Sequence, residues 1–340
     1  MKKFISVLFL MLVGCGSNTQ AADHYPSEWP WKGINMLSTT PYTELDRIAS
    51  QRIKHVFLDV QPSKMSGGMT EAVAWLNAAL DRCRALELRC SVRFDDVPLT
   101  SVTFWDDPAQ LDAAFTQIET IIRGVGNRKV WHWHFLSEPT YSLPTGAIQP
   151  PEWPAFFERI RVMLRSVRPR DWLAYSPGPW GLAGGFKGLQ PFADNRIIYN
   201  FHSYTPHPYT HQGIYAQYPY GVTWPGEPWP GSPYPSQAGI WDANRLRSSM
   251  QAVRDFQVAN NVPVMVGSFS AVRWAPDAEQ YILDSAEIFN DYEWGYAYWC
   301  YGSYNGWNPD YDTTYDPANY KQQYIGLNSI RWDTLRKILD

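Results

Sequence analysis

The residues with the clearest chemical potential lie in the run 131–139, which reads Trp-His-Trp-His-Phe-Leu-Ser-Glu-Pro. Side chains of a β-strand alternate between its two faces, so His132, His134 and Glu138 share one side if this run is a strand. The aromatic side chains of the other side are expected to face surrounding helices: Trp131, Trp133 and Phe135. A carboxyl group where a strand ends suits acid–base catalysis, whereas a lone Glu in a turn is more often simply solvated.

Metal binding is the less favoured interpretation of the two histidines. His132 and His134 have the spacing of a metal-ligand pair on a strand. The candidates to complete such a site are distant in the sequence: His202, Asp95 and Asp96. Interior histidines with hydrogen-bond partners are therefore the better explanation. An aspartate-rich segment at 310–316 lacks the glycine and terminal glutamate of an EF-hand, so we expect solvated turn residues, no metal and no cofactor.

Eight short apolar runs alternate with amphipathic stretches, which is the pattern of parallel strands joined by helices. The strand-like runs are 33–37, 54–60, 88–94, 130–136, 172–176, 196–202, 262–269 and 294–301. The helix-like stretches are 42–52, 70–87, 108–124, 152–167, 242–260, 277–291 and 329–339, and only the fifth crossover, around 185–193, is short. We predict an α/β fold with a single (β/α)8 barrel over residues 32–340, which gathers the carboxyl ends of its strands at one rim.

Two segments are too long to be simple connections between barrel elements. They cover 203–240, after the sixth strand, and 302–325, after the eighth, and both are rich in Tyr, Trp and Pro. This composition argues against disorder. Long loops at the carboxyl rim form active-site walls, and flat aromatic rings suit the apolar faces of sugars. The alternative is an aromatic cover over the barrel without any ligand.

Short motifs fall within or directly after five of the predicted strands. Residues 33–35 read Gly-Ile-Asn, 136–139 Leu-Ser-Glu-Pro, 202–204 His-Ser-Tyr and 264–269 Val-Met-Val-Gly-Ser-Phe, and Trp299 lies in the eighth strand. In this order and spacing they resemble the motifs of family 5 glycoside hydrolases, the cellulase and mannanase group, over roughly residues 29–339. The resemblance implies a (β/α)8 TIM barrel that acts on the O-glycosidic bonds of a β-linked glucan, mannan or related glycan.

The resemblance also implies roles for individual residues. Glu138 matches the general acid/base of a retaining glycosidase, His202 and Tyr204 match supporting hydrogen-bonding residues, and Trp299 matches the ring under the sugar. Further substrate contacts are expected from Asn35, Ser137 and Trp307. A retaining mechanism needs a second carboxyl group about 5–5.5 Å from the first. In the family this group is a glutamate of the seventh strand.

The chain departs from the family pattern at this second carboxyl group, because Ser268 stands at the nucleophile position. A serine hydroxyl is neutral and is a weak nucleophile without a base. Ser137 replaces an asparagine, and Phe57 stands where the second strand usually carries an arginine near the nucleophile. The absence of that arginine is consistent with the absence of its carboxylate partner. The nearest substitute carboxylates are Asp95 and Asp96, although we favour a structural role in the loop for this pair.

Three interpretations of Ser268 stay open at this stage. It is an engineered substitution that traps substrate, the mark of a natural glycan-binding protein without catalysis, or a feature of a variant enzyme that uses another carboxylate. We favour a glycoside hydrolase, and a catalytically inactive glycan-binding protein at the cell surface is the alternative.

The N-terminal residues predict export. Two lysines precede the apolar stretch 4–13, which is too short to span a bilayer. Residues 12–15 read Leu-Val-Gly-Cys and resemble a bacterial lipobox, so we expect removal of 1–14, a lipid on Cys15, and a tether over 15–31. The protein would then be an outer-membrane lipoprotein, or a periplasmic or cell-surface protein. Cleavage near Ala21 or Ala22 would instead give a secreted protein.

Composition narrows the expected partners. The net charge is −4 and there is no basic stripe, which argues against nucleic acid. The chain has 17 Trp, 21 Tyr and 15 Phe, an excess that suits both carbohydrate binding and a bulky core. We therefore expect a carbohydrate ligand, membrane contact only through the lipid on Cys15, and a monomer. An oxidising compartment would permit a disulfide between Cys83 and Cys90.

Overall fold

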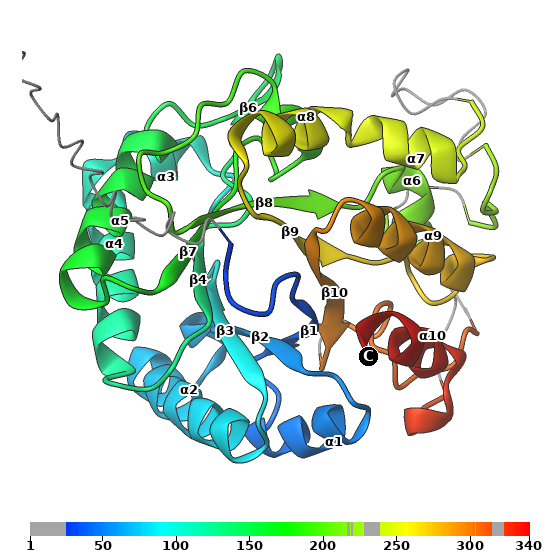
Figure 1. Ribbon diagram of the computed structural model, residues 1–340, viewed down its shortest axis with the longest axis horizontal. Helices are drawn as coiled ribbons and strands as arrows, with labels where there is room; N and C mark the ends of the chain where they lie inside the picture. Colours follow the sequence, from blue (N-terminus) through cyan, green and yellow to red (C-terminus); the bar gives the residue numbers. More distant parts are fainter. Residues whose placement is uncertain (1–24, 216–217, 219, 228–238, 303, 315–322) are drawn as a thin grey trace, which may run out of the picture.

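The strands close into a ring of eight. The structure is a computed structural model that describes residues 25–215, 218, 220–227, 239–302, 304–314 and 323–340. All neighbouring pairs are parallel, and β1 pairs with both β2 and β10, which closes the barrel (Figure 1). The strands are β1 Lys32–Leu37, β2 His55–Asp59, β3 Arg89–Phe94, β4 His132–Phe135, β7 Trp172–Tyr175, β8 Ile197–Ser203, β9 Val264–Phe269 and β10 Gly295–Tyr301. The predicted TIM barrel is confirmed.

Helices surround this ring close to the predicted positions. They are α1 Leu45–Ser50, α2 Gly68–Ala85, α4 Pro108–Gly124, α5 Trp153–Val167, α7 Ala243–Ser249, α8 Gln251–Asn260, α9 Ala278–Asp291 and α10 Ile330–Leu339, with 3-10 turns at η1 Tyr42–Glu44, η2 Pro62–Lys64, η3 Ala183–Phe186 and η5 Gly326–Asn328. The single helix predicted over 242–260 is two helices, because the backbone of Met250 (φ −99°, ψ 4°) interrupts it. The short fifth crossover contains only η3.

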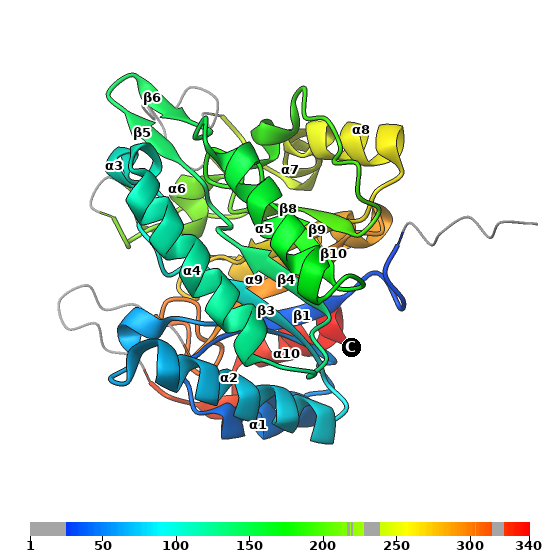
Figure 2. The ribbon, with the colours of Figure 1, turned by 90° about the vertical axis from the view of Figure 1, so that its left-hand side faces the viewer.

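Three small elements were not predicted. They are α3 Val102–Asp106, α6 His207–Thr210, and a hairpin of β5 Tyr141–Leu143 with β6 Gly146–Ile148. Figure 2 shows the hairpin projecting beyond the ring next to α3. The helix α6 lies within the long segment 203–240, so that segment is partly ordered into regular structure. Such short elements carry too few residues for a clear hydrophobic period.

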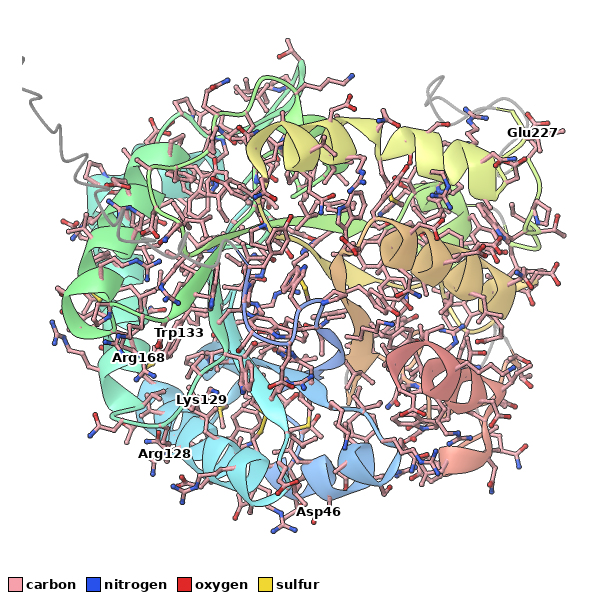
Figure 3. The ribbon with its side chains drawn as sticks, viewed as in Figure 1. Asp46, Arg128, Lys129, Trp133, Arg168 and Glu227 are labelled. Atoms are coloured by element: carbon pink, nitrogen blue, oxygen red, sulfur yellow. A yellow bond between two sulfur atoms is a disulfide. The ribbon has the colours of Figure 1, made fainter. Side chains whose placement is uncertain are left out.

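The side chains of β4 confirm part of the predicted alternation. Trp133 and Phe135 are completely buried in the large core between strands and helices. Arg168 lies against the Trp133 ring, 5.4 Å from its centroid, outside the strand ring (Figure 3). The prediction is wrong for Trp131, which precedes the strand and packs edge-on against Trp31, with their ring centroids 5.5 Å apart. Strand periodicity does not apply to a residue outside the strand.

The amino end of the barrel is filled by aromatic and apolar side chains. Trp31, from the predicted tether segment, belongs to a buried cluster inside the ring with Phe57, Trp172, Ala174, Ile198, Met265 and Ala297. Phe57 is only 2% exposed there. This position in β2 therefore serves as packing and does not face a binding site.

The interior histidines are hydrogen-bonded, as the sequence predicted. The Ser91 hydroxyl lies 2.6 Å from His55 Nε2 and 2.7 Å from His132 Nδ1. His134 Nε2 lies 2.9 Å from the Ser176 hydroxyl. Burial lowers the pKa of His134 to about 3. Among the described residues, no group of three or more His, Cys, Asp or Glu side chains is placed to hold a metal ion.

The carboxyl end of β4 is held by a buried ion pair. Asp95 accepts hydrogen bonds from Arg93 Nε at 2.5 Å and from the Ser137 backbone at 2.6 Å, and Arg93 Nη2 donates to Ser137 Oγ at 2.6 Å. Burial would raise the pKa of Asp95, but Arg93 beside it holds that pKa below its ordinary value. Strand alternation ends at Leu136, whose φ is 55°, so the turn rather than the strand period places Glu138.

A disulfide joins Cys83, in α2, to Cys90, in β3, with 6.3 Å between their Cα atoms. None of the helices described is long and apolar enough to cross a membrane. Cys15, Ala21 and Ala22 lie outside the described part of the chain, as do parts of the predicted long segments 203–240 and 302–325.

The buried histidines make stability depend on pH. We expect His134→Asn to reduce the loss of stability that acid causes, measured as the free energy of unfolding in denaturant at pH 7 and pH 5. In the unfolded chain this imidazole takes up a proton below about 6.5, while in the folded chain it stays neutral until about 3. Stability is therefore lost as the pH falls through this window, by about 1.4 kcal/mol per pH unit for one such group. An equal drop in the free energy of unfolding from pH 7 to pH 5 in His134→Asn and in the unchanged protein would contradict this account.

Breaking the buried ion pair between Arg93 and Asp95 should lower the stability of the fold substantially. Asp95→Ala leaves the Arg93 charge buried beside a reduced set of acceptors, so we expect a loss of about 3–5 kcal/mol in the free energy of unfolding. The matched control is Asp46→Ala, which removes the partner of Arg82 at the outer edge of the molecule (Figure 3). The Arg82 and Asp46 side chains are 39% and 46% exposed, so we expect little change in the free energy of unfolding. Equal losses in the two variants would refute the proposed importance of the buried pair.

Candidate active site

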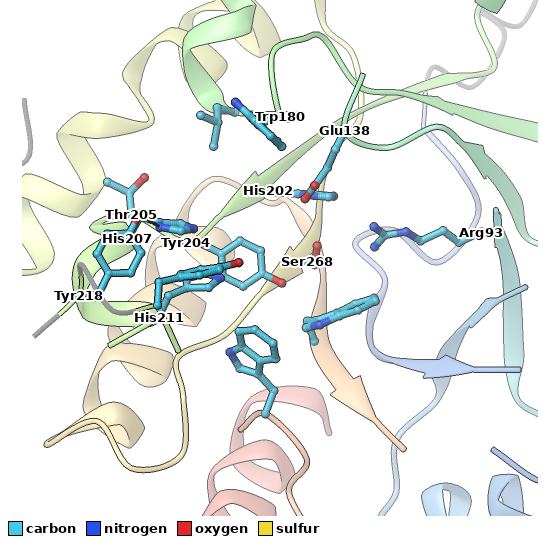
Figure 4. Close-up of a pocket in the computed structure, with 14 residues that line it drawn as sticks. Arg93, Glu138, Trp180, His202, Tyr204, Thr205, His207, His211, Tyr218 and Ser268 are labelled. Atoms are coloured by element: carbon cyan, nitrogen blue, oxygen red, sulfur yellow. Dashed lines mark hydrogen bonds and ion pairs between the residues drawn. The ribbon is translucent and has the colours of Figure 1, made fainter. Parts of the chain in front are cut away.

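A cavity of about 600 Å³ opens at the carboxyl rim of the barrel, which is a size typical of ligand sites. Its walls come from strand ends and from both long segments (Figure 4). The lining residues are Arg93, Glu138, Trp180, Leu182, His202, Tyr204, Thr205, His207, His211, Tyr215, Tyr218, Ser268, Trp299 and Trp307. Residues separated by more than 200 positions in the sequence thus meet in one place.

Glu138 presents its carboxylate to this cavity from the turn after β4. Its Oε1 lies 2.7 Å from His202 Nδ1. The Glu138 side chain is 38% exposed, whereas the His202 side chain is 1% exposed. The buried imidazole therefore fixes the orientation of a carboxylate that remains open to a ligand. When Glu138 is ionised, His202 Nδ1–H donates to it, which assigns the tautomer of this ring.

Ser268 lies in β9 directly beside His202 in β8, because the two residues are register partners in neighbouring strands. In Figure 4 the Ser268 side chain lies below the Glu138 carboxylate, on the side toward which the Arg93 guanidinium points. Tyr204 lines the same cavity, and burial raises the pKa of its phenol well above the ordinary value. The Tyr204 phenol is therefore protonated near neutral pH and can donate to a ligand.

Trp299 and Arg93 form another side of the cavity. The Arg93 guanidinium lies over the Trp299 ring, 5.0 Å from its centroid, which is a cation–π arrangement. Arg93 was not among the residues predicted for the site. Its guanidinium comes from β3, whereas the family arginine was expected at the Phe57 position of β2. An arginine two residues before Asp95, at the end of a predicted strand, was the available signal.

The long aromatic segments contribute to the cavity and also to the core. Tyr215 and Tyr218, from 203–240, and Trp307, from 302–325, line the cavity, as their predicted place at the rim suggested. The rings of His207 and His211 stack there, 3.8 Å apart and 19° from parallel. Other aromatic side chains of the first segment are buried in the core instead: Tyr209 and Trp224. The aromatic excess thus serves both purposes that the composition suggested.

Several residues predicted from the sequence lie near the cavity without lining it. The Asn35 amide is buried and donates to the backbone oxygens of Gly267 and Tyr298, each at 3.2 Å. Ser137 is buried and hydrogen-bonded to Arg93 and Asp95. Neither Asn35 nor Ser137 is among the residues that line the cavity.

Neither alternative carboxylate reaches the cavity. Asp95 is held by Arg93 and Ser137, and Asp96 accepts hydrogen bonds from the backbone and hydroxyl of Ser63, both at 2.5 Å. The structural role that we favoured for this pair matches these contacts. Within the described part of the chain, Glu138 is the one carboxylate among the cavity-lining residues.

Comparison with known proteins agrees with this arrangement. The family model described as cellulase (glycosyl hydrolase family 5) matches residues 108–305, and no curated protein sequence matches the chain. Among solved structures, the endoglucanase Cel5A of Thermotoga maritima has a TM-score of 0.67 at 19% identity, covering 91% of this chain and 97% of that one.

The cellulose synthase subunit Z of Clostridioides difficile has a TM-score of 0.63 at 16% identity, covering 93% of this chain and 95% of the other. Cel5A in complex with mannotriose has a TM-score of 0.67 at 18% identity, with coverage of 91% and 97%. Likeness at these identities shows a shared fold, while the family model spans more than half of the sequence. The chain is a glycoside hydrolase-like protein and belongs to glycosyl hydrolase family 5.

Proposed function

We propose that the protein hydrolyses β-linked glycans, with Glu138 as its general acid/base. The observation that carries this proposal is the Glu138 carboxylate, open to the cavity and oriented by His202 through a hydrogen bond of 2.7 Å. A sugar stacked on Trp299 would present its glycosidic oxygen to this carboxyl group. Tyr204 and Ser268 would face the sugar from the neighbouring strand ends.

The chemistry assigns two tasks to Glu138. In its protonated form it donates a proton to the leaving glycosidic oxygen, and in its ionised form it later removes a proton from the attacking water. His202 Nδ1 can hydrogen-bond to either form, because an imidazole nitrogen donates to a carboxylate in one tautomer and accepts from a carboxylic acid in the other. His202 is therefore a positioning residue, since it acts on the substrate only through Glu138.

The opposite side of the sugar meets no protein carboxylate in the described cavity. Ser268 stands where the family carries its nucleophilic glutamate, and a neutral hydroxyl cannot stabilise an oxocarbenium-like transition state as a carboxylate does. The nucleophile on that side must therefore come from a group other than the described lining side chains. The competing account of Ser268 is a protein that binds glycans without cleaving them.

Two observations support the proposed substrate class: the aromatic lining of the cavity and the sugars bound in similar solved structures. The endoglucanase Cel5A has been solved with cellobiose and with mannotriose, both of them short glycans. The cavity of this chain carries three tryptophan rings that suit sugar faces: Trp180, Trp299 and Trp307. We therefore propose a β-linked oligosaccharide or polysaccharide as the substrate.

We also propose that the protein acts outside the cytoplasm on a lipid anchor. The support is the sequence Leu-Val-Gly-Cys at 12–15, directly after an apolar stretch. A lipid on Cys15 would tether the barrel through residues 15–31 to the outer membrane, in the periplasm or at the cell surface.

Replacing Glu138 by Gln should abolish cleavage. We expect Glu138→Gln to lower kcat/KM by about 10²–10⁴-fold on any β-linked glycan that the unchanged protein cleaves, because the amide cannot donate or accept the catalytic proton. The measurement is release of reducing ends from a panel of β-linked glycans of different sugars. Glu287→Gln, an exposed position on α9, is the matched control and should cleave normally. Binding without cleavage by the unchanged protein would favour the inactive alternative instead.

The proposed lipid anchor predicts that loss of Cys15 changes the cell fraction in which the protein is found. Cys15→Ser removes the thiol that carries the lipid, so the protein should move from the membrane fraction to the soluble fraction of cells. Immunoblotting of the two fractions measures this, with the disulfide variant Cys83→Ser as a cysteine control that keeps the anchor. A soluble protein before the substitution would favour cleavage near Ala21 or Ala22.

A further inference from the structure

Among the described residues that line the cavity, none supplies a second carboxylate where a retaining β-glycosidase has its nucleophile. At Ser268 a hydroxyl stands where glutamate has a CH2–COO⁻ group, so the side chain at this position occupies less of the cavity than a glutamate would. Ser268 belongs to the cavity wall. Asp95 cannot occupy the space, because it is fixed by Arg93 and Ser137 away from the cavity.

The space is bordered by hydroxyl groups that suit an amide. The Ser268 and Tyr204 side chains both line the cavity. Ser268 Oγ can accept a hydrogen bond from an amide N–H, and the Tyr204 O–H can donate to an amide carbonyl. The Trp299 ring, backed by Arg93 at 5.0 Å, lies at the same site and offers an apolar face. An acetamido group matches this set in polarity and approximates the missing carboxymethyl unit in size.

We propose that the substrate is a β-linked glycan with a 2-acetamido sugar in this site, and that its own acetamido oxygen replaces the missing carboxylate. This inference rests on the proposed function and names the nucleophile that it leaves open. Neutral glucans and mannans carry only a hydroxyl at the 2-position, so they supply no comparable group. Substrate-assisted cleavage is an established alternative to a protein nucleophile.

The reaction then balances with Glu138 as the single protein carboxyl group. The acetamido carbonyl oxygen forms a bond to the anomeric carbon as the bond from that carbon to the leaving oxygen breaks, and Glu138 gives its proton to that oxygen. The product is a cyclic oxazolinium ion. Water next attacks the anomeric carbon, Glu138 removes its proton, the ring carbon–oxygen bond breaks, and the acetamido group is restored. The configuration is retained because two displacements occur at one carbon.

The first test uses the unchanged mature protein with defined β-linked oligosaccharides of N-acetylglucosamine, glucosamine, glucose and mannose. We expect cleavage of the acetamido series alone. A thiazoline analogue of the acetamido sugar, which imitates the cyclic intermediate, should bind about 100-fold or more tightly than the free sugar. Cleavage of glucose or mannose oligomers without inhibition by the thiazoline would overturn this inference while leaving the proposed function intact. No cleavage of any oligomer would overturn both.

The second test places a carboxylate at position 268. Ser268→Glu should lose cleavage of the acetamido series and affinity for the thiazoline, because its carboxylate occupies the place of the acetamido group. Ser248→Glu adds the same charge at an exposed position of α7 and should change neither property. Thermal unfolding checks that both variants are folded. A folded Ser268→Glu variant that keeps full turnover of the acetamido series would contradict the inference.

Discussion

The closed ring of parallel strands is the constraint on which the rest of the structure depends. Because β1 pairs with both β2 and β10, all eight strands end at one rim. Glu138, Ser268 and Trp299 are far apart in the sequence, yet the closure brings them around one cavity. The register of β8 with β9 sets His202 beside Ser268, so the residue that orients Glu138 lies next to the position of the family nucleophile.

Two local interactions convert this rim into a site with defined geometry. The buried His202 ring orients the Glu138 carboxylate, and the ion pair of Arg93 with Asp95 holds the turn that carries Glu138. In each interaction one partner is almost completely buried, His202 in the first and Arg93 in the second, and an unpaired buried charge is costly. The site is thus arranged before a ligand arrives, which is what acid–base catalysis at a fixed carboxyl group requires.

Much of the fold could be predicted from the sequence, and part of the site could not. Apolar runs separated by amphipathic stretches located all eight strands, because burial in a barrel leaves a strong pattern. Glu138, His202 and Trp299 were found through motifs at strand ends. Arg93 was missed, because a charged residue within a strand has no periodic signal, and its partner Asp95 and the Trp299 ring adjoin it only after folding.

The stereochemistry of the first product tests the central claim most directly. Proton NMR can follow the anomeric configuration of the sugar released from a β-linked oligomer of N-acetylglucosamine before it equilibrates in water. A barrel in which Glu138 protonates the leaving group and the acetamido oxygen attacks from the opposite side predicts the β-anomer. Initial release of the α-anomer would mean a single displacement by water, and it would contradict this account of the site.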